Sequence, residues 1–226
     1  MVAAEARLER SPGAPRPLLR SLIAVCGVAG PLILVASFRM NPAPPAGLAT
    51  AALAAWAAAH IGALLVGGWM QGIGSALIVI FALGLVELGG DAGFAGRLTG
   101  LAGATILAVS LLEITFYLAV AQAIAVGDTV LGLVAGGLIK ATQHVFLIAP
   151  ALLLPLGAAI LTTRVLPRAF GWSALAIGAL LQSLGLAGVL TPLQGVIDVV
   201  LIVQALWFVA AGVALGVTRR QRTTAE

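Results

Sequence analysis

Residues 98–123, "LTGLAGATILAVSLLEITFYLAVAQA", decide the fold class, because they carry a single charged residue in a run that is otherwise apolar, small or hydroxyl-bearing. A helix that crosses the hydrocarbon core of a bilayer, about 30 Å thick, needs about 20 predominantly apolar residues. With a rise of about 1.5 Å per residue, this stretch is long enough to cross. It therefore predicts a transmembrane helix that carries Glu113 inside the membrane.

The composition of the whole chain indicates the same solvent. Hydrophobic residues make up 61% of the 226 positions and charged residues only 9%, whereas a soluble domain carries about a quarter charged residues. So few charges cannot cover a surface that faces water, so we expect the lipid bilayer to be the main partner of the chain. The net charge of +4 does not indicate nucleic acid, because the basic residues lie at chain ends and short connections instead of on one face with aromatic residues.

Six segments have the length and composition of a spanning helix. They are 21–38, about 63–88, about 98–123, about 143–161, about 171–190 and about 196–217. The stretch 46–60 directly precedes the second span, and the stretch 129–142 directly precedes the fourth. In each case the stretch and its span together are too long for a single crossing. We predict that both stretches form short helices at the outer interface, with Trp56 at headgroup level, and that Pro150 and Pro155 kink the fourth span.

The distribution of basic residues predicts the orientation. If the N-terminus is cytoplasmic, ten of the twelve Lys and Arg residues lie on the inner side, which is a strong positive-inside bias. The inner residues are Arg7, Arg10, Arg16, Arg20, Arg97, Arg164, Arg168, Arg219, Arg220 and Arg222; the outer ones are Arg39 and Lys140. We therefore predict an all-α polytopic bundle of six spans with both chain ends in the cytoplasm. Its parts are a basic N-terminal segment (1–20), one transmembrane domain (21–217) and a basic tail (218–226).

The chain also resembles six-span inner-membrane proteins of high-GC bacteria that have no assigned activity. The resemblance rests on Ala/Gly/Leu-rich spans, on "PPAGLATAALAAWAAAH" at 44–60 and on "RLTGLAGATILAVSLLEITFYLA" at 97–119. It implies a bacterial plasma-membrane location and the same number of spans. It implies no activity.

Glu113 is the main candidate for a functional residue. An ionisable side chain inside a bilayer costs on the order of 3 kcal/mol on insertion scales and usually faces the bundle interior. Ser110 and Tyr117 lie on its helical face at i−3 and i+4. Apolar surroundings favour the neutral, hydrogen-bonding form of a carboxyl. Two interpretations stay open: a proton-carrying or substrate-binding carboxyl, and a polar clamp that holds helices together.

The predicted topology places further polar residues at the same outer level. His60 begins the second span, His144 begins the fourth, and Gln194 and Asp198 open the sixth. With Glu113 and its neighbours, these residues are candidates to line one pocket that opens outward. The alternative is that they are ordinary solvated residues at the ends of spans.

The two histidines raise the question of a cofactor. Two imidazoles at one depth can ligate a haem b, and two histidines with a carboxylate can hold zinc or another divalent metal. The sequence contains no HExxH, GxSxG, Walker or CxxC motif, and the single Cys26 excludes an intramolecular disulfide. These absences favour a chain that is not an enzyme.

Three functional hypotheses follow from the sequence. The first is an intramembrane pocket that binds or transports a small molecule, a lipid or an ion, with Glu113 as its protonatable group. The second is a haem- or metal-binding electron-transfer protein that uses His60 and His144. The third is a non-catalytic subunit of a membrane complex, with homo-oligomerisation as a further possibility. Pairs of glycines spaced by four, such as Gly68 and Gly72, favour close helix packing in any of the three.

Overall fold

The computed structural model describes residues 16–41, 50–148, 152–190 and 194–223. Within these ranges, the side chains at 16, 50, 51, 53, 54, 139–148, 185–190, 194–198, 200, 201 and 218–223 lie outside the description. These residues form seven α-helices and no strand. The helices are α1 (Arg16–Met40), α2 (Thr50–Gly89), α3 (Gly93–Val126), α4 (Thr129–Ile148), α5 (Leu153–Thr163), α6 (Arg168–Leu190) and α7 (Gln194–Thr223). The all-α prediction is confirmed.

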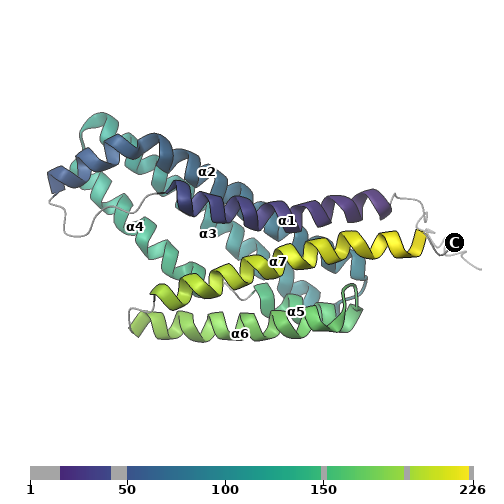
Figure 1. Cartoon of the computed structure of the whole chain (residues 1–226). Coiled ribbons are helices and arrows are strands. Elements are labelled where there is room, and N and C mark those ends of the chain that lie inside the picture. Colours follow the sequence, from purple (N-terminus) through teal and green to yellow (C-terminus); the bar gives the residue numbers. More distant parts are fainter. Residues whose placement is uncertain (1–15, 42–49, 149–151, 191–193, 224–226) are drawn as a thin grey trace, which may run out of the picture.

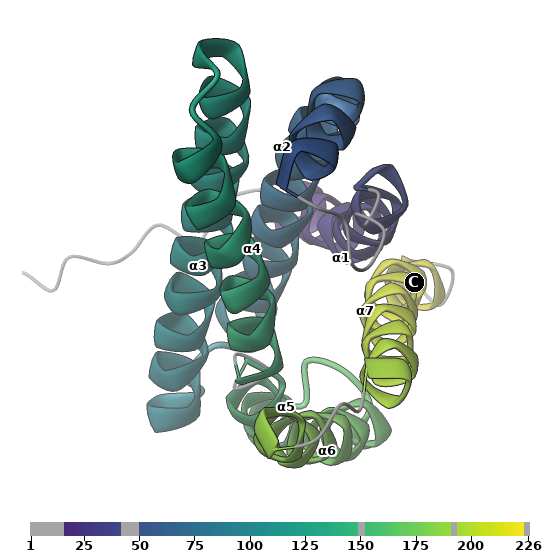
Figure 2. The same ribbon diagram turned by 90° about the vertical axis from the view of Figure 1, so that its left-hand side faces the viewer.

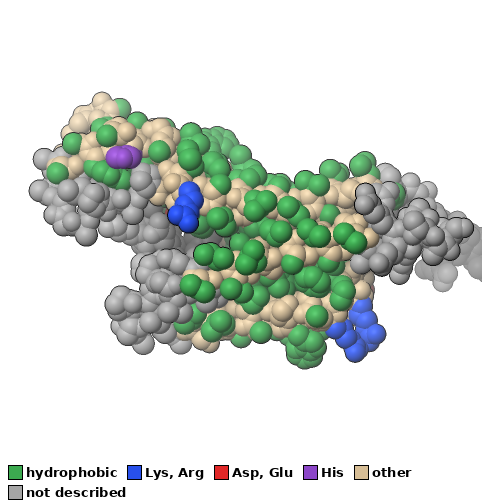
Figure 3. Space-filling model, in the orientation of Figure 1, with side chains coloured by type: hydrophobic (Ala, Val, Ile, Leu, Met, Phe, Trp, Pro, Cys, Tyr) green, Lys and Arg blue, Asp and Glu red, His purple; other side chains and the backbone are tan. Residues whose placement is uncertain are grey.

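Three helices are long and apolar enough to cross a membrane, judged on the described residues alone. They are Pro17–Met40 in α1, Ala55–Gly89 in α2 and Gly93–Val126 in α3. Many large apolar side chains on their outer faces are exposed, including Val25, Leu101 and Leu111. Figure 3 shows such side chains spread over the visible face of the molecule. A surface of this kind is typical of contact with lipid, and it fits the prediction of a membrane protein.

The length of α2 differs from the prediction. A separate helix at 46–60 is wrong, because α2 runs without interruption from Thr50 to Gly89, which is 40 residues or about 60 Å. Its first turns are rich in alanine, the strongest helix former, and its interior contains no proline that would remove a backbone hydrogen bond. Lipid can cover only the part of a helix that lies within the bilayer, but the helix does not have to end where the bilayer ends.

The predicted fourth span is also not one helix. In the described residues α4 ends at Ile148 and α5 begins at Leu153, and the 11 residues of α5 cover only about 16 Å. Pro155 lies in the first turn of α5, where its missing N–H would have no helical acceptor. Pro150 and the kink predicted there lie outside the described residues. The turn predicted at residues 127 and 128 is confirmed, with Gly127 in the left-handed conformation between α3 and α4.

The helices α1, α6 and α7 run roughly along one long axis, so that the start of α1 and the end of α7 lie at the same end of the bundle (Figure 1). The Arg20 side chain on α1 donates a hydrogen bond to the Leu215 carbonyl on α7 at 2.9 Å. Gly89 at the end of α2 lies against Thr163 at the end of α5. We call this the basic end, because Arg20, Arg97, Arg164 and Arg168 lie there.

The opposite end is formed by three helices. The start of α2, the end of α3 and the start of α4 extend beyond the other helices (Figures 1 and 2), and we call this the projecting end. Asp128 lies at its tip, where its carboxylate accepts a hydrogen bond from the Leu131 N–H and caps α4.

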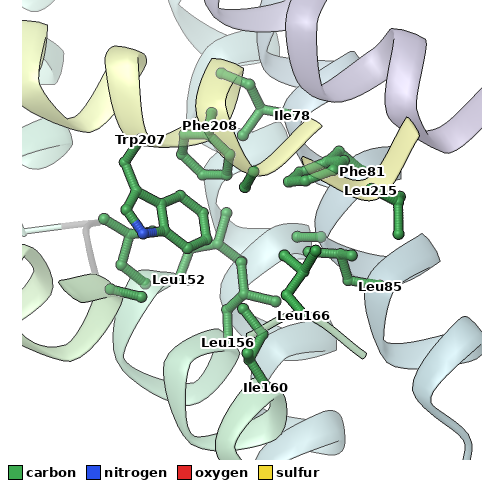
Figure 4. Packing of buried hydrophobic residues seen from close by; sticks show 14 of the residues in the cluster. Ile78, Phe81, Leu85, Leu152, Leu156, Ile160, Leu166, Trp207, Phe208 and Leu215 are labelled. Atoms are coloured by element: carbon green, nitrogen blue, oxygen red, sulfur yellow. The ribbon is translucent and has the colours of Figure 1, made fainter. Parts of the chain in front are cut away.

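The main apolar core lies where α2, α5 and α7 meet (Figure 4). Phe81 of α2 and Phe208 of α7 are fully buried and pack edge to face, with ring centroids 6.0 Å apart. Leu156 and Ile160 place α5 against them with no exposed surface. The short α5 is therefore a buried core helix, and the polar residues of α2 and α3 lie outside this core.

Candidate functional site

One face of α3 carries the predicted site residues. Ser110, Glu113 and Tyr117 are all buried, and they recur every three or four residues along a stripe that faces α2. Glu113 is only 1% exposed although it lies in a 34-residue apolar helix. The structure thus brings these three residues to one interior surface.

Close contacts fix how α2 lies against this stripe. A methyl group at Gly68 would come within 3.1 Å of the Tyr117 ring, and one at Gly103 within 3.0 Å of the Val79 side chain. The two helices are therefore antiparallel, and their register places Gln71 opposite Glu113. The same register places Ser75, one turn further along α2, at the level of Ser110 on α3.

Glu113 has one hydrogen-bond partner in the described part of the chain. Gln71 Nε2 donates to Glu113 Oε2, and both side chains are 1% exposed. The carboxyl accepts in this contact, which both its ionised and its protonated forms can do. No described cationic side chain forms an ion pair with Glu113, so the carboxyl is held by a neutral amide alone.

Several buried oxygens around Glu113 have no hydrogen-bond partner. They are Gln71 Oε1, Ser75 Oγ, Ser110 Oγ and, at the end of α1, Asn41 Oδ1. Only one further buried side-chain atom in the described residues is unpartnered, Gln182 Oε1 on α6. Buried polar groups are normally paired, so four unpaired oxygens gathered between α1, α2 and α3 require an explanation.

These residues form three layers along the helix axes. Asn41 and Tyr117 form the first layer, where Asn41 Nδ2 lies 3.4 Å from the Tyr117 hydroxyl. Gln71 and Glu113 lie one turn deeper, about 6 Å towards the basic end, and the two serines lie another turn below them. We call this set the polar cluster: Asn41, Gln71, Ser75, Ser110, Glu113 and Tyr117.

The polar cluster lies about midway between the projecting end and the basic end, since Gln71 is near the centre of α2 and Glu113 is somewhat past the centre of α3. From Arg97, the last basic residue before it on α3, the axis rises about 24 Å to Glu113. Asn41 directly follows the last residue of α1, so the first layer sits where that helix ends.

His60 does not join the polar cluster. Its Nδ1 lies 2.8 Å from the Trp56 carbonyl, and its ring stacks on the Trp56 ring with centroids 4.7 Å apart. Because α2 is continuous, His60 lies eleven residues, or about 16 Å, from Gln71. The predicted convergence of His60 with Glu113 is therefore wrong.

Three other residues were predicted to share that site. The side chains of His144, Gln194 and Asp198 lie outside the described residues. Within the described part of the chain, no group of three or more His, Cys, Asp or Glu side chains could hold a metal ion.

Three residues of the polar cluster were not predicted from the sequence: Asn41, Gln71 and Ser75. A signal for two of them was present, because Gln71 is the only amide side chain in α2 and Ser75 follows it by four residues on the same face. A polar pair at i and i+4 inside an apolar span predicts a buried polar stripe. Asn41 carries no such pattern, since it lies beside a turn rather than within a helix.

Two cavities lie away from Glu113. One, of about 320 Å³, lies between the start of α2, the end of α3 and the start of α4, and its lining includes Ala57, Val120 and Leu133. The other, of about 530 Å³, is an open groove between α3 and α5 lined by residues such as Leu101 and Leu154. Neither of these two cavities is lined by Glu113. Gln71, Ser75, Ser110 and Glu113 are each at most 1% exposed, so they are packed between the helices.

The polar cluster offers a limited chemistry. It contains one carboxyl, one phenol, two amides and two hydroxyls. Such groups can hold or exchange a proton, or provide oxygen atoms to a cation. No protein-family model, curated protein or solved structure matches the chain significantly.

Proposed function

We propose that this chain is a six-span protein of the bacterial inner membrane that transports a small ion or molecule with Glu113 as its proton-binding carboxyl. In this proposal the basic end faces the cytoplasm and the projecting end faces outward. The polar cluster then lies beneath the outer surface.

The topology is supported by helix lengths and by the distribution of charge. The α6 and α7 helices contain 23 and 30 residues, enough for about 34 and 45 Å. The α4 and α5 helices together provide the fourth crossing, which completes six. Both chain ends then lie on the side that carries ten of the twelve basic residues, as the positive-inside rule requires.

The observation that carries the functional proposal is the buried, incompletely paired carboxyl of Glu113. A carboxyl that only clamped two helices together would be expected in a network whose polar atoms are all paired, because an unpaired buried group removes much of the gain. Here Gln71 Oε1, Ser75 Oγ and Ser110 Oγ have no partner. Incomplete pairing of this kind fits a site that takes up and releases a ligand or a proton.

Access to Glu113 is proposed to come from the projecting end. The contact between Asn41 Nδ2 and the Tyr117 hydroxyl, at 3.4 Å, is at the long limit for a hydrogen bond and is therefore easily broken. These two side chains form the layer one helical turn above Glu113, at the end of α1. Their separation would open a path of about one helical turn to the carboxyl.

Proton flux tests the proposal. Purified protein is reconstituted into liposomes that contain a pH-sensitive dye, and a potassium diffusion potential drives protons inward. We expect wild-type protein to accelerate acidification and Glu113→Gln to abolish the acceleration, because an amide cannot carry the proton. Glu87→Gln is the matched control, since Glu87 is an exposed residue on α2 near the basic end. Equal flux from wild type and Glu113→Gln would refute the proposal.

A further inference from the structure

We infer that the polar cluster binds a small monovalent cation, with the Glu113 carboxylate, Gln71 Oε1, Ser75 Oγ and Ser110 Oγ as its oxygen ligands. This inference rests on the proposed function of Glu113 and names the ion that the site takes. It follows from the juxtaposition of one carboxylate with three buried oxygens that lack hydrogen-bond donors.

The ligand type indicates a hard cation. Alkali and alkaline-earth ions prefer oxygen atoms, and membrane proteins bind them by replacing water of hydration with carbonyl and side-chain oxygens. In the polar cluster, Gln71 uses its Nε2 on Glu113, which leaves Oε1 free to accept or to ligate. The register of α2 and α3 places the two serine hydroxyls one turn below, so that ligands come from both helices. A cation in this position would pair the three unpaired oxygens of Gln71, Ser75 and Ser110.

The charge balance indicates a monovalent ion. Glu113 is the only carboxylate among the residues of the polar cluster, and one positive charge neutralises it. A divalent ion would leave a net buried charge, which is strongly unfavourable in an apolar environment. Nitrogen or sulfur ligands, which select transition metals, are absent from the polar cluster.

Charged and titratable groups on the packed helices bear on this balance. Tyr117 is the only other titratable side chain of the polar cluster. Arg39 on α1 is exposed and lies two residues before Asn41, and α5 carries no titratable residue. On α4, Lys140 and His144 belong to the residues whose side chains lie outside the description.

The proton and the cation compete for the same carboxyl. A protonated Glu113 is neutral, and its O–H can donate to Gln71 Oε1 after rotation of the amide, which removes two ligands at once. Loss of that proton provides the carboxylate and frees the amide oxygen, so one cation enters as one proton leaves and the site stays neutral. We therefore expect cation affinity to fall as the pH is lowered.

Direct binding of radioactive sodium ion to the purified full-length protein in lipid nanodiscs tests the inference. Wild-type protein is expected to bind sodium saturably, more weakly at acidic pH, with lithium or potassium as competitors and calcium as a poor one. Ser110→Ala should weaken binding about tenfold or more, a loss of the size seen when a supporting group of a metal site is removed. Ser183→Ala is the matched control, because Ser183 is exposed and only donates to the Ala179 carbonyl on its own helix.

The outcomes separate this inference from the proposed function. If wild type binds no sodium, or if Ser110→Ala and Ser183→Ala both bind as wild type does, the cation site is overturned. Proton flux that still depends on Glu113 would then leave the proposed function standing. Stronger binding of calcium than of sodium would also overturn the inference, since it contradicts the charge balance. Gln71→Leu provides a second test, because it removes the Oε1 ligand and should also weaken sodium binding. If Gln71→Leu does not fold, Ser110→Ala alone decides.

Discussion

Replacing Gly74 with valine is expected to separate α1 from α2 and to lower the free energy of unfolding by about 1–3 kcal/mol, the usual cost of overpacking. A Cβ atom at Gly74 would lie 2.9 Å from the Gly30 carbonyl oxygen and 2.9 Å from the Leu34 nitrogen. Both are backbone atoms of α1, so no side-chain rotation relieves the clash. Helix association in lipid depends on such close packing, so loss of the contact between α1 and α2 lowers the stability of the bundle.

The matched control lies on the same helix. A Cβ atom at Gly62 meets no atom within 4 Å, so Gly62→Val changes helix propensity without a clash. Unfolding by sodium dodecyl sulfate in mixed micelles, followed by circular dichroism, compares the free energies of unfolding of the two variants. Equal losses for Gly74→Val and Gly62→Val would show that α1 does not pack against α2 as described.

Gln71→Leu is expected to cost about 1.5–3 kcal/mol of stability, the range for a hydrogen bond to a charged group. The Gln71 amide is the only described hydrogen-bond donor to Glu113, so leucine leaves a buried carboxyl without a partner. The Glu113→Leu, Gln71→Leu double variant should recover much of this loss, because replacing both partners with apolar groups removes the unpaired group. The same unfolding assay measures the four proteins of this double-mutant cycle, which are wild type, the two single variants and the double variant.

Two results would contradict this account of the pair. If the double variant loses as much stability as the sum of the single variants, Gln71 and Glu113 do not interact. If Gln71→Leu is as stable as wild type, the carboxyl has another partner or is not buried.

The sequence predicted much of α3 and its site. Apolar composition identified a span at 98–123, within the observed Gly93–Val126, and the period of 3.6 residues placed Ser110 and Tyr117 on the face of Glu113. Both inferences depend on one helix alone. Composition and local geometry are sufficient for them because neighbouring turns of a helix always have the same relation to one another.

The partner of Glu113 could not be predicted in the same way. Its pairing with Gln71 depends on the register between α2 and α3, which is set by contacts such as Gly68 against Tyr117 and Gly72 against Ile114. No single segment contains that information. The prediction for His60 failed for a related reason, since bilayer thickness was used to divide a helix that is continuous in the structure.

The most direct test of the central claim is an infrared titration of the Glu113 carboxyl in lipid-reconstituted protein. The account predicts a carboxylic acid band that appears as the external pH is lowered, is absent from Glu113→Gln and remains in Glu87→Gln. Addition of sodium should shift the appearance of the band to lower pH. A carboxyl band that is the same in wild type and Glu113→Gln at every pH would contradict the claim that Glu113 exchanges a proton within the membrane.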